Sequence, residues 1–150
     1  MTNYIKNIIL PFGTFHIVSD GKAITALYTG TQTETSPCPL LEEAARQLTE
    51  YANGTRQVFA LPVAPKGSDF QQAVWAALQT IPYGQTRTYG DIAAQIGNPK
   101  ATRAVGMACN RNPILMVIPC HRVIGKNGSL TGFGAGLELK ETLLNLEHRS

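Results

Sequence analysis

Cysteine is scarce in this sequence of 150 residues: it occurs three times, at Cys38, Cys109 and Cys120. An odd number of cysteines at wide spacing is not a disulfide framework, and no spacing among them matches a metal site. The sequence therefore excludes a small secreted domain held by disulfides, and we expect no bound metal. A reducing cytoplasm is the expected compartment, since the N-terminus also lacks the pattern of a signal peptide.

Long apolar runs and a strong net charge are missing as well. No run approaches the roughly 20 apolar residues of a membrane-spanning helix, so we expect no membrane association. The formal net charge of +3 permits a polyanionic partner but does not by itself indicate one. Between Arg87 and Lys126, Asp91 is the single acidic residue against six lysines and arginines. This stretch predicts either an ordinary solvated face or a surface that contacts phosphates.

Residues 1–61 are predicted to form a small α/β domain. Runs rich in β-branched and aromatic residues, separated by turn signals, indicate strands. Apolar residues at helical spacing then indicate one helix. The expected elements are strands over Ile5–Leu10, Phe15–Ser19 and Ile24–Tyr28, a helix over Leu40–Tyr51 and one more strand over Val58–Leu61. None of these elements carries a pattern of chemically active residues.

Residues 62–67 contain two prolines and a glycine and are predicted to be a linker. This leaves residues 68–150 as a second, mostly helical domain. Its first helix is expected to begin at Ser68, because a serine followed three residues later by Gln71 fits a capping box.

Two further short helices indicate a helix-turn-helix motif in the second domain. The first begins after Thr88 and runs to Ile96. The second covers Lys100 to about Asn110, and a tight turn that contains Gly97 joins the two. Such pairs also occur as plain corners between packed helices, so DNA binding is one of two interpretations of the motif.

The second of these helices has an unusual surface, because small residues surround one long side chain, Arg103. Gly106 within it costs about 1 kcal/mol of helix stability relative to alanine. Small residues let a helix backbone come close either to another helix or to a DNA groove, into which Arg103 could reach. The small residues are Ala101, Thr102, Ala104, Gly106 and Ala108.

A cysteine and a histidine stand side by side at Cys120 and His121, after the apolar run Ile114–Ile118 and Pro119. The run predicts a buried strand that ends at the proline. A thiol beside an imidazole is a candidate nucleophile, although a free cysteine is often no more than a small core residue. Successive residues of a strand point to opposite faces, so cooperation between the two requires a kink after Pro119 or a bridging water.

The C-terminal part is predicted to contain a glycine-rich loop over Thr131–Gly136 and an amphipathic helix with Glu147 near its end. So many glycines preclude regular structure, and the loop is expected to be either mobile or closely packed.

The second domain resembles the methylated-DNA–protein-cysteine methyltransferases, also called O6-alkylguanine-DNA alkyltransferases. The matches extend over about residues 68 to 147, and the Pro-Cys-His-Arg-Val string is highly specific in this context. The first domain is similar only in being a small α/β unit of suitable size, for which the family implies a ribonuclease H-like fold. The matches are Phe70-Gln71, Val74-Trp75, Ile81 to Gly84, Thr88-Tyr89, Arg103 to Gly106, Asn112-Pro113, Ile118 to Ile124, Gly132, Gly136, Lys140, Leu143-Leu144 and Glu147.

The resemblance implies a chemistry for the cysteine. Proteins of this family move an alkyl group from O6-alkylguanine, and also from O4-alkylthymine, in DNA to their own cysteine, which here is Cys120. His121 would activate the thiol through a water, Glu147 would orient and charge the imidazole, and Asn112 would pin the active-site turn by hydrogen bonds. The product is a thioether that water cannot cleave, so the protein would act once and need no cofactor.

The resemblance also implies how DNA is held. The helix-turn-helix would bind the minor groove of double-stranded DNA, with its small residues close to the groove. Arg103 would fill the space of a flipped nucleotide, which must leave the stack because the reactive atom of a paired base is out of reach. Tyr89 would press the phosphate aside and donate a hydrogen bond to the departing guanine.

Three residues, Trp75, Gly132 and Phe133, are expected in the substrate pocket. Phe133 stands where many members carry a tyrosine, so one hydroxyl contact is lost and the range of accepted alkyl groups is affected. Some members bind zinc in the first domain, but His16 and Cys38 are too few for such a site here. A monomer associated with the nucleoid of a prokaryote is the expected state.

Three other functions stay open on the sequence. A binder of alkylated DNA from the same family branch would lack the cysteine, and the presence of Cys120 argues against it. A Cys-His hydrolase would turn over an acyl substrate and would give no role to Tyr89 or Arg103. The DNA-binding arm of a regulator would need a sensor domain, for which residues 1–61 are small.

Overall fold

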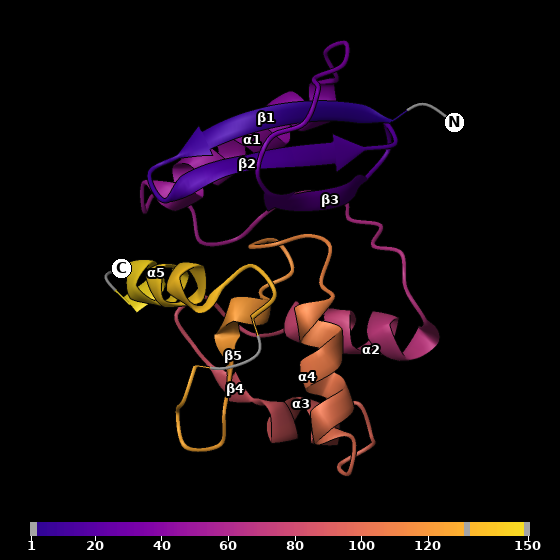
Figure 1. Cartoon of the computed structure of the whole chain (residues 1–150), viewed down its shortest axis with the longest axis vertical. Helices are drawn as coiled ribbons and strands as arrows, with labels where there is room; N and C mark the ends of the chain where they lie inside the picture. The colour runs from indigo at the N-terminus through magenta and orange to yellow at the C-terminus, as the bar shows by residue number, and fades with distance from the viewer. Residues whose placement is uncertain (1–2, 131–132, 149–150) are drawn as a thin grey trace. The chain divides into compact units, whose positions relative to one another are not determined.

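The computed structural model describes residues 3–130 and 133–148 of the chain. Its backbone divides into two compact units, Met1–Lys66 and Gly67–Ser150 (Figure 1). The first unit holds a sheet and a helix and the second is mostly helical, which confirms the predicted mixed α/β fold class. Every helix among the described residues is too short or too polar to pass through a lipid bilayer.

The first unit is a three-stranded antiparallel sheet with one helix on one face (Figure 1). Alternate strand residues point toward the helix: Ile8 and Phe15, for example, lie opposite each other on neighbouring strands and are both buried. The three predicted strands and the helix are confirmed, with small differences at their ends. In chain order the elements are β1 (Tyr4–Leu10), β2 (Gly13–Ser19), β3 (Ile24–Thr29) and α1 (Pro39–Ala52).

The strand predicted over Val58–Leu61 is wrong, and the following residues take part in the sheet instead. The amide side chain of Gln47 on α1 donates to the carbonyl of Ala60 and accepts from its N–H, which occupies the groups that a strand would pair. Farther on, Ile24 N donates to the Pro62 carbonyl over 2.8 Å, and Ala64 N donates to the Ile24 carbonyl over 2.9 Å. The first residues of the segment predicted as a linker are therefore tied to β3.

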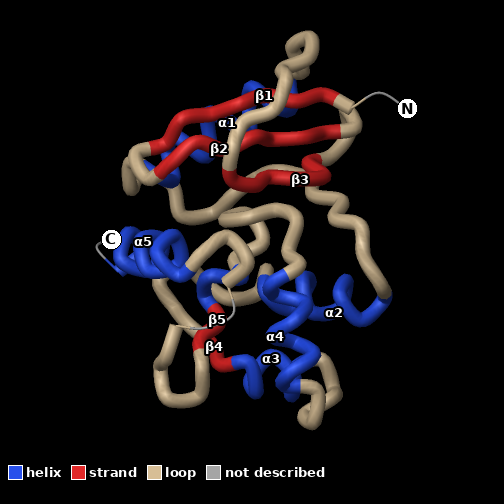
Figure 2. The backbone as a smooth tube through the Cα atoms, viewed as in Figure 1, coloured by secondary structure: helices blue, strands red, loops and turns tan. Residues whose placement is uncertain are grey.

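The second unit is built from four helices and a very short parallel strand pair (Figure 2). Its first helix begins at the predicted capping box, in which Ser68 and Gln71 cap each other's backbone N–H groups. The strand pair was not predicted, since two residues carry no periodic signal. The elements are α2 (Asp69–Leu78), β4 (Arg87–Thr88), α3 (Tyr89–Gln95), α4 (Thr102–Asn110), the 3₁₀ turn η1 (Cys120–Arg122), β5 (Val123–Ile124) and α5 (Leu137–His148).

The predicted helix-turn-helix corresponds to α3 and α4. Thr88 caps α3 through a hydrogen bond from Asp91 N, and the turn that follows includes Gly97 with a φ of +80°, where glycine is favoured. The second helix begins at Thr102 rather than at Lys100. Behind α4, the indole N–H of Trp75 on α2 donates to the carbonyl of Ala108 over 2.9 Å, in the core of the unit.

The strand predicted over Ile114–Ile118 is also wrong, because this apolar run forms a buried turn. Ile118 N donates to the Ile114 carbonyl and Val117 N donates to the Leu115 carbonyl, so the run pairs part of its backbone within itself rather than with a neighbouring strand. Met116 adopts a left-handed φ of 68° within it. A short apolar run shows that a segment is buried but does not show that it is extended.

Candidate active site

Cys120 lies at the start of η1, directly after the turn. Its N–H donates to the Ile118 carbonyl over 2.8 Å, and Pro119 precedes the 3₁₀ turn with ψ near 63°. The chain therefore kinks at Pro119, which is one of the two arrangements that the sequence left open. Three residues make one turn of a 3₁₀ helix, so Cys120 and His121 do not point to opposite faces as they would in a strand. The thiol is nearly enclosed, with 2% of Cys120 exposed.

Asn112 holds this turn together. Its side-chain nitrogen donates to the Ile118 carbonyl over 2.8 Å and lies 3.1 Å from the Cys120 sulfur, while its oxygen accepts from Ile114 N over 3.0 Å. The residue is buried, so these bonds have no competition from water. Asn112 thus fixes both the backbone around the cysteine and the position of the sulfur.

The cysteine is a neutral thiol at rest. Burial raises the pKa of Cys120 to about 11, against the opposing effects of the Asn112 hydrogen bond and the Lys140 ammonium group. Only the thiolate is a strong nucleophile. The sulfur therefore needs a nearby base that takes its proton when a substrate arrives.

His121 is placed to be that base. It is fully buried, and its Nε2 lies 2.6 Å from Oε2 of Glu147. Burial lowers the pKa of His121 although the carboxylate opposes this, so the ring is neutral at neutral pH. A neutral ring with its proton on Nε2 donates to Glu147 and leaves Nδ1 as an acceptor. This Nδ1 is buried and has no hydrogen-bond partner among the described residues.

Glu147 reaches His121 from α5 and also binds Arg122, which was not among the predicted site residues. Arg122 Nε donates to Oε1 over 2.8 Å and Nη2 donates to Oε2 over 3.0 Å, so the pair is bidentate. Gly84 N adds a bond to Oε1 over 3.2 Å. Arg122 is itself buried and its Nη1 donates to the Ile81 carbonyl. The signals in the sequence were its position next to His121 and its place in the Pro-Cys-His-Arg-Val string, and neither indicates a partner for the guanidinium.

A second buried cation, Lys140, joins the predicted tyrosine and phenylalanine. Its Nζ lies 3.4 Å from the hydroxyl of Tyr89, 5.6 Å from the centre of that ring and 6.0 Å from the centre of the Phe133 ring. Burial lowers the pKa of Lys140. Tyr89 and Phe133, predicted from the family pattern, are therefore brought together around one ammonium group from α5.

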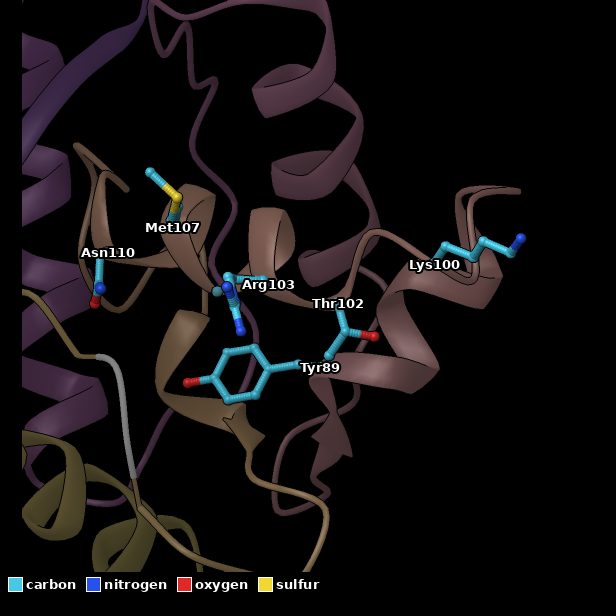
Figure 3. A pocket seen from close by; sticks show the side chains of 7 residues that line it. Tyr89, Lys100, Thr102, Arg103, Met107 and Asn110 are labelled. Carbon is cyan, nitrogen blue, oxygen red and sulfur yellow. The ribbon is translucent and has the colours of Figure 1, made fainter.

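The helix-turn-helix carries an open pocket of about 840 Å³ next to Tyr89 (Figure 3). Exposed side chains of α4 line it, including Arg103, and Figure 3 shows Arg103 and Tyr89 at the same side of the pocket. At Gly106 an added Cβ atom would lie 3.9 Å from the Tyr89 ring, an ordinary van der Waals distance, so α4 lies beside the ring at this position. The lining residues are Tyr89, Lys100, Thr102, Arg103, Gly106, Met107 and Asn110.

The other predicted site residues lie elsewhere. Ala104 lines a smaller neighbouring pocket of about 220 Å³, and Ala101 lies just before α4. Trp75 belongs to the core and not to a substrate pocket, because its buried ring packs between α2 and α4. Gly132 lies outside the described residues. Within those residues, no group of three or more histidine, cysteine or acidic side chains could hold a metal.

These features define a class: a helix-turn-helix unit that also holds a buried thiol next to a histidine. Two family models match the chain. The DNA binding domain of 6-O-methylguanine DNA methyltransferase matches residues 69–149, and the ribonuclease-like domain of the same protein matches residues 4–65. The chain belongs to the 6-O-methylguanine DNA methyltransferase family.

Individual relatives agree with this. The constitutive methylated-DNA–protein-cysteine methyltransferase of Bacillus subtilis is 46% identical, over 99% of this chain and 97% of its own. The methylated-DNA–protein-cysteine methyltransferase of Methanosarcina acetivorans is 61% identical over 70% of this chain and 67% of its own. A crystal structure of the Mycobacterium tuberculosis O6-methylguanine methyltransferase superposes with a TM-score of 0.91 at 42% identity, covering 99% of this chain and 94% of that one.

Replacing Asn112 with alanine tests how far the site depends on it. Asn112→Ala leaves the buried Ile114 N–H without its partner and removes one of the two donors to the Ile118 carbonyl, which costs about 1–3 kcal/mol of unfolding free energy. Urea denaturation followed by circular dichroism measures this loss. Asn110→Ala is the matched control, since Asn110 is exposed on α4, and we expect a change below about 0.5 kcal/mol. Equal effects of the two variants would contradict the assigned role.

Proposed function

We propose that this protein repairs DNA by transferring a methyl or larger alkyl group from O6 of guanine to the sulfur of Cys120. The observation that carries the proposal is a buried neutral thiol on a kinked turn, followed by a neutral imidazole that a buried carboxylate orients. The relatives that cover nearly the whole chain are named for this reaction. A related M. tuberculosis protein, 44% identical over 97% of this chain, has been crystallised in complex with DNA.

The transfer consists of one displacement and two proton movements. The sulfur attacks the alkyl carbon, forming a C–S bond while the C–O bond to guanine breaks. The thiol proton passes to Nδ1 of His121 through a bridging water, and the imidazolium is stabilised by Glu147. Negative charge develops on the departing guanine, which takes the proton of the Tyr89 hydroxyl. Lys140, 3.4 Å from that hydroxyl, favours the charge that Tyr89 then carries.

Each protein molecule carries out a single turnover. Alkylated Cys120 is a thioether with no carbonyl or imine carbon for water to attack, so His121 cannot regenerate the thiol. We therefore propose a stoichiometric enzyme that requires no cofactor.

DNA is bound through α3 and α4, in the minor groove. O6 of a paired guanine lies on the major-groove edge of the stack, away from a protein in the minor groove, so the nucleotide must rotate out to bring its alkyl group to the enclosed sulfur. Arg103 is exposed on α4 beside Tyr89 and is long enough to replace the rotated base. Few acidic residues oppose the phosphates here, since Asp91 is the only acid between Arg87 and Lys126.

The finer features of the proposal follow from the same site. Alkyl groups on O4 of thymine present the same carbon–oxygen bond to the sulfur, and we include them as substrates. Phe133 packs near Lys140 and has no hydroxyl group. The pocket therefore has one polar contact fewer than in family members that carry a tyrosine here. We propose that a monomer acts on double-stranded DNA in the cytoplasm.

Intact-protein mass spectrometry tests the transfer. After incubation with duplex DNA that carries O6-methylguanine, we expect a gain of one methylene on the peptide that contains Cys120, ending at one equivalent. Cys120→Ala should lose the transfer and keep DNA binding. Methylation of the Cys120→Ala protein, or multiple turnovers, would contradict the proposal, and turnover of an acyl ester would favour a Cys-His hydrolase.

Arg103→Ala tests nucleotide flipping separately from the chemistry. We expect methyl transfer from duplex DNA to slow by about tenfold or more, because the flipped state loses the side chain that replaces the base. Transfer from the free base O6-methylguanine should change little, since no duplex has to open. Lys22→Ala, which removes an exposed positive charge from the first unit, is the control. Equal losses on both substrates would count against the role of Arg103.

A further inference from the structure

The carboxylate of Glu147 receives at least four hydrogen bonds in the interior of the second unit. His121 Nε2 and Arg122 Nη2 meet Oε2, while Arg122 Nε and the Gly84 N–H meet Oε1. Only 2% of Glu147 is exposed. A carboxylate with this many donors stays ionised, because each bond favours the charged form. Its negative charge is therefore a fixed feature of the site.

Arg122 balances that charge. Its guanidinium is always protonated, lies in bidentate contact with the carboxylate and is anchored by a third bond to the Ile81 carbonyl. The guanidinium carbon also lies 5.7 Å from the centre of the Tyr83 ring. These contacts hold the guanidinium against the Glu147 carboxylate.

Burial is the largest influence that lowers the pKa of His121, and the charges that face the ring add to it or oppose it. From α5 come Glu147, which favours the imidazolium, and Lys140, which disfavours it. From η1 come Arg122, which also disfavours it, and Cys120, which is neutral at rest. Beside an isolated buried carboxylate, His121 would take up a proton. Beside a neutral Glu147–Arg122 pair it keeps Nδ1 free, and this nitrogen is the buried acceptor without a partner.

We infer that Arg122 is a positioning residue for the reaction: by neutralising Glu147 it keeps His121 unprotonated and directs its free Nδ1 toward the proton of Cys120. This inference rests on the proposed function of Cys120. During transfer the thiol proton moves to Nδ1, and the Glu147–Arg122 pair changes neither its charge nor its bonds. Arg122 thus serves the base without touching the substrate.

Two substitutions separate the charge of Arg122 from its shape. Arg122→Lys keeps the positive charge but loses the bidentate fork, whereas Arg122→Gln keeps one donor and loses the charge. Ring signals of ¹⁵N,¹³C-labelled histidine report protonation and tautomer as the pH is varied. The chain has three histidines, and His16 and His148 serve as internal references in the same spectra.

We expect the midpoint of the His121 titration to depend on whether residue 122 carries a positive charge. Arg122→Gln should move the midpoint of the His121 titration upward by about one pH unit or more, and Arg122→Lys should move it much less. The acidic limb of the methyl-transfer rate should shift in the same direction, because an imidazolium cannot accept the thiol proton. Equal midpoints in the two variants, with rates lowered alike at every pH, would show a merely structural role and overturn the inference.

The double variant Arg122→Gln with Glu147→Gln covers the case in which Arg122→Gln does not fold. Removing one partner of a buried ion pair leaves an uncompensated charge, whereas removing both does not. The double variant should therefore fold, and failure to fold would contradict the inference. Transfer by the unmodified protein is measured alongside: its absence would refute the proposed function, while the His121 titration would still decide the role of Arg122.

Discussion

The second unit depends on one buried carboxylate, that of Glu147, through its ion pair and its hydrogen bonds. It joins α5 to η1 through His121 and Arg122, and to the segment after α2 through Gly84. These parts are 25 to 63 residues apart in the chain, so one side chain brings together what the sequence separates. A buried ion pair contributes little net stability, but breaking one side of it is costly. The arrangement is therefore better understood as fixing the geometry and charge of a site.

The nucleophile and the DNA-binding surface of the second unit differ in their exposure to solvent. Cys120 is enclosed and neutral, while Arg103 on α4 is exposed beside the open pocket. Tyr89 and Lys140 connect these two regions through their contact with each other. Tyr89 lines the pocket, and the positive charge of Lys140 opposes the rise in the pKa of Cys120. With 2% of Cys120 exposed, the thiol has little contact with solvent.

Local signals predicted much of the fold. The capping box at Ser68 and the start of a helix after Thr88 follow from local residues, and the helices follow from apolar spacing. Burial of the run before Cys120 was also predicted, but its path was not, because Met116 in a left-handed conformation leaves no trace in hydrophobicity. The partners of Glu147 come from distant segments, and no local pattern indicates that Arg122 turns inward. The family pattern supplied Glu147 and Asn112, but it placed the core residue Trp75 in the pocket.

The central claim is that the resting site holds a neutral thiol and a neutral imidazole and forms the thiolate only during attack. The most direct measurement is the ¹³Cβ chemical shift of labelled Cys120 as the pH is raised, with Cys109→Ala and Cys38→Ala used to assign the signal. We expect a thiol at pH 7.5 that titrates at about pH 11. A thiolate already present at pH 7.5 would contradict the account.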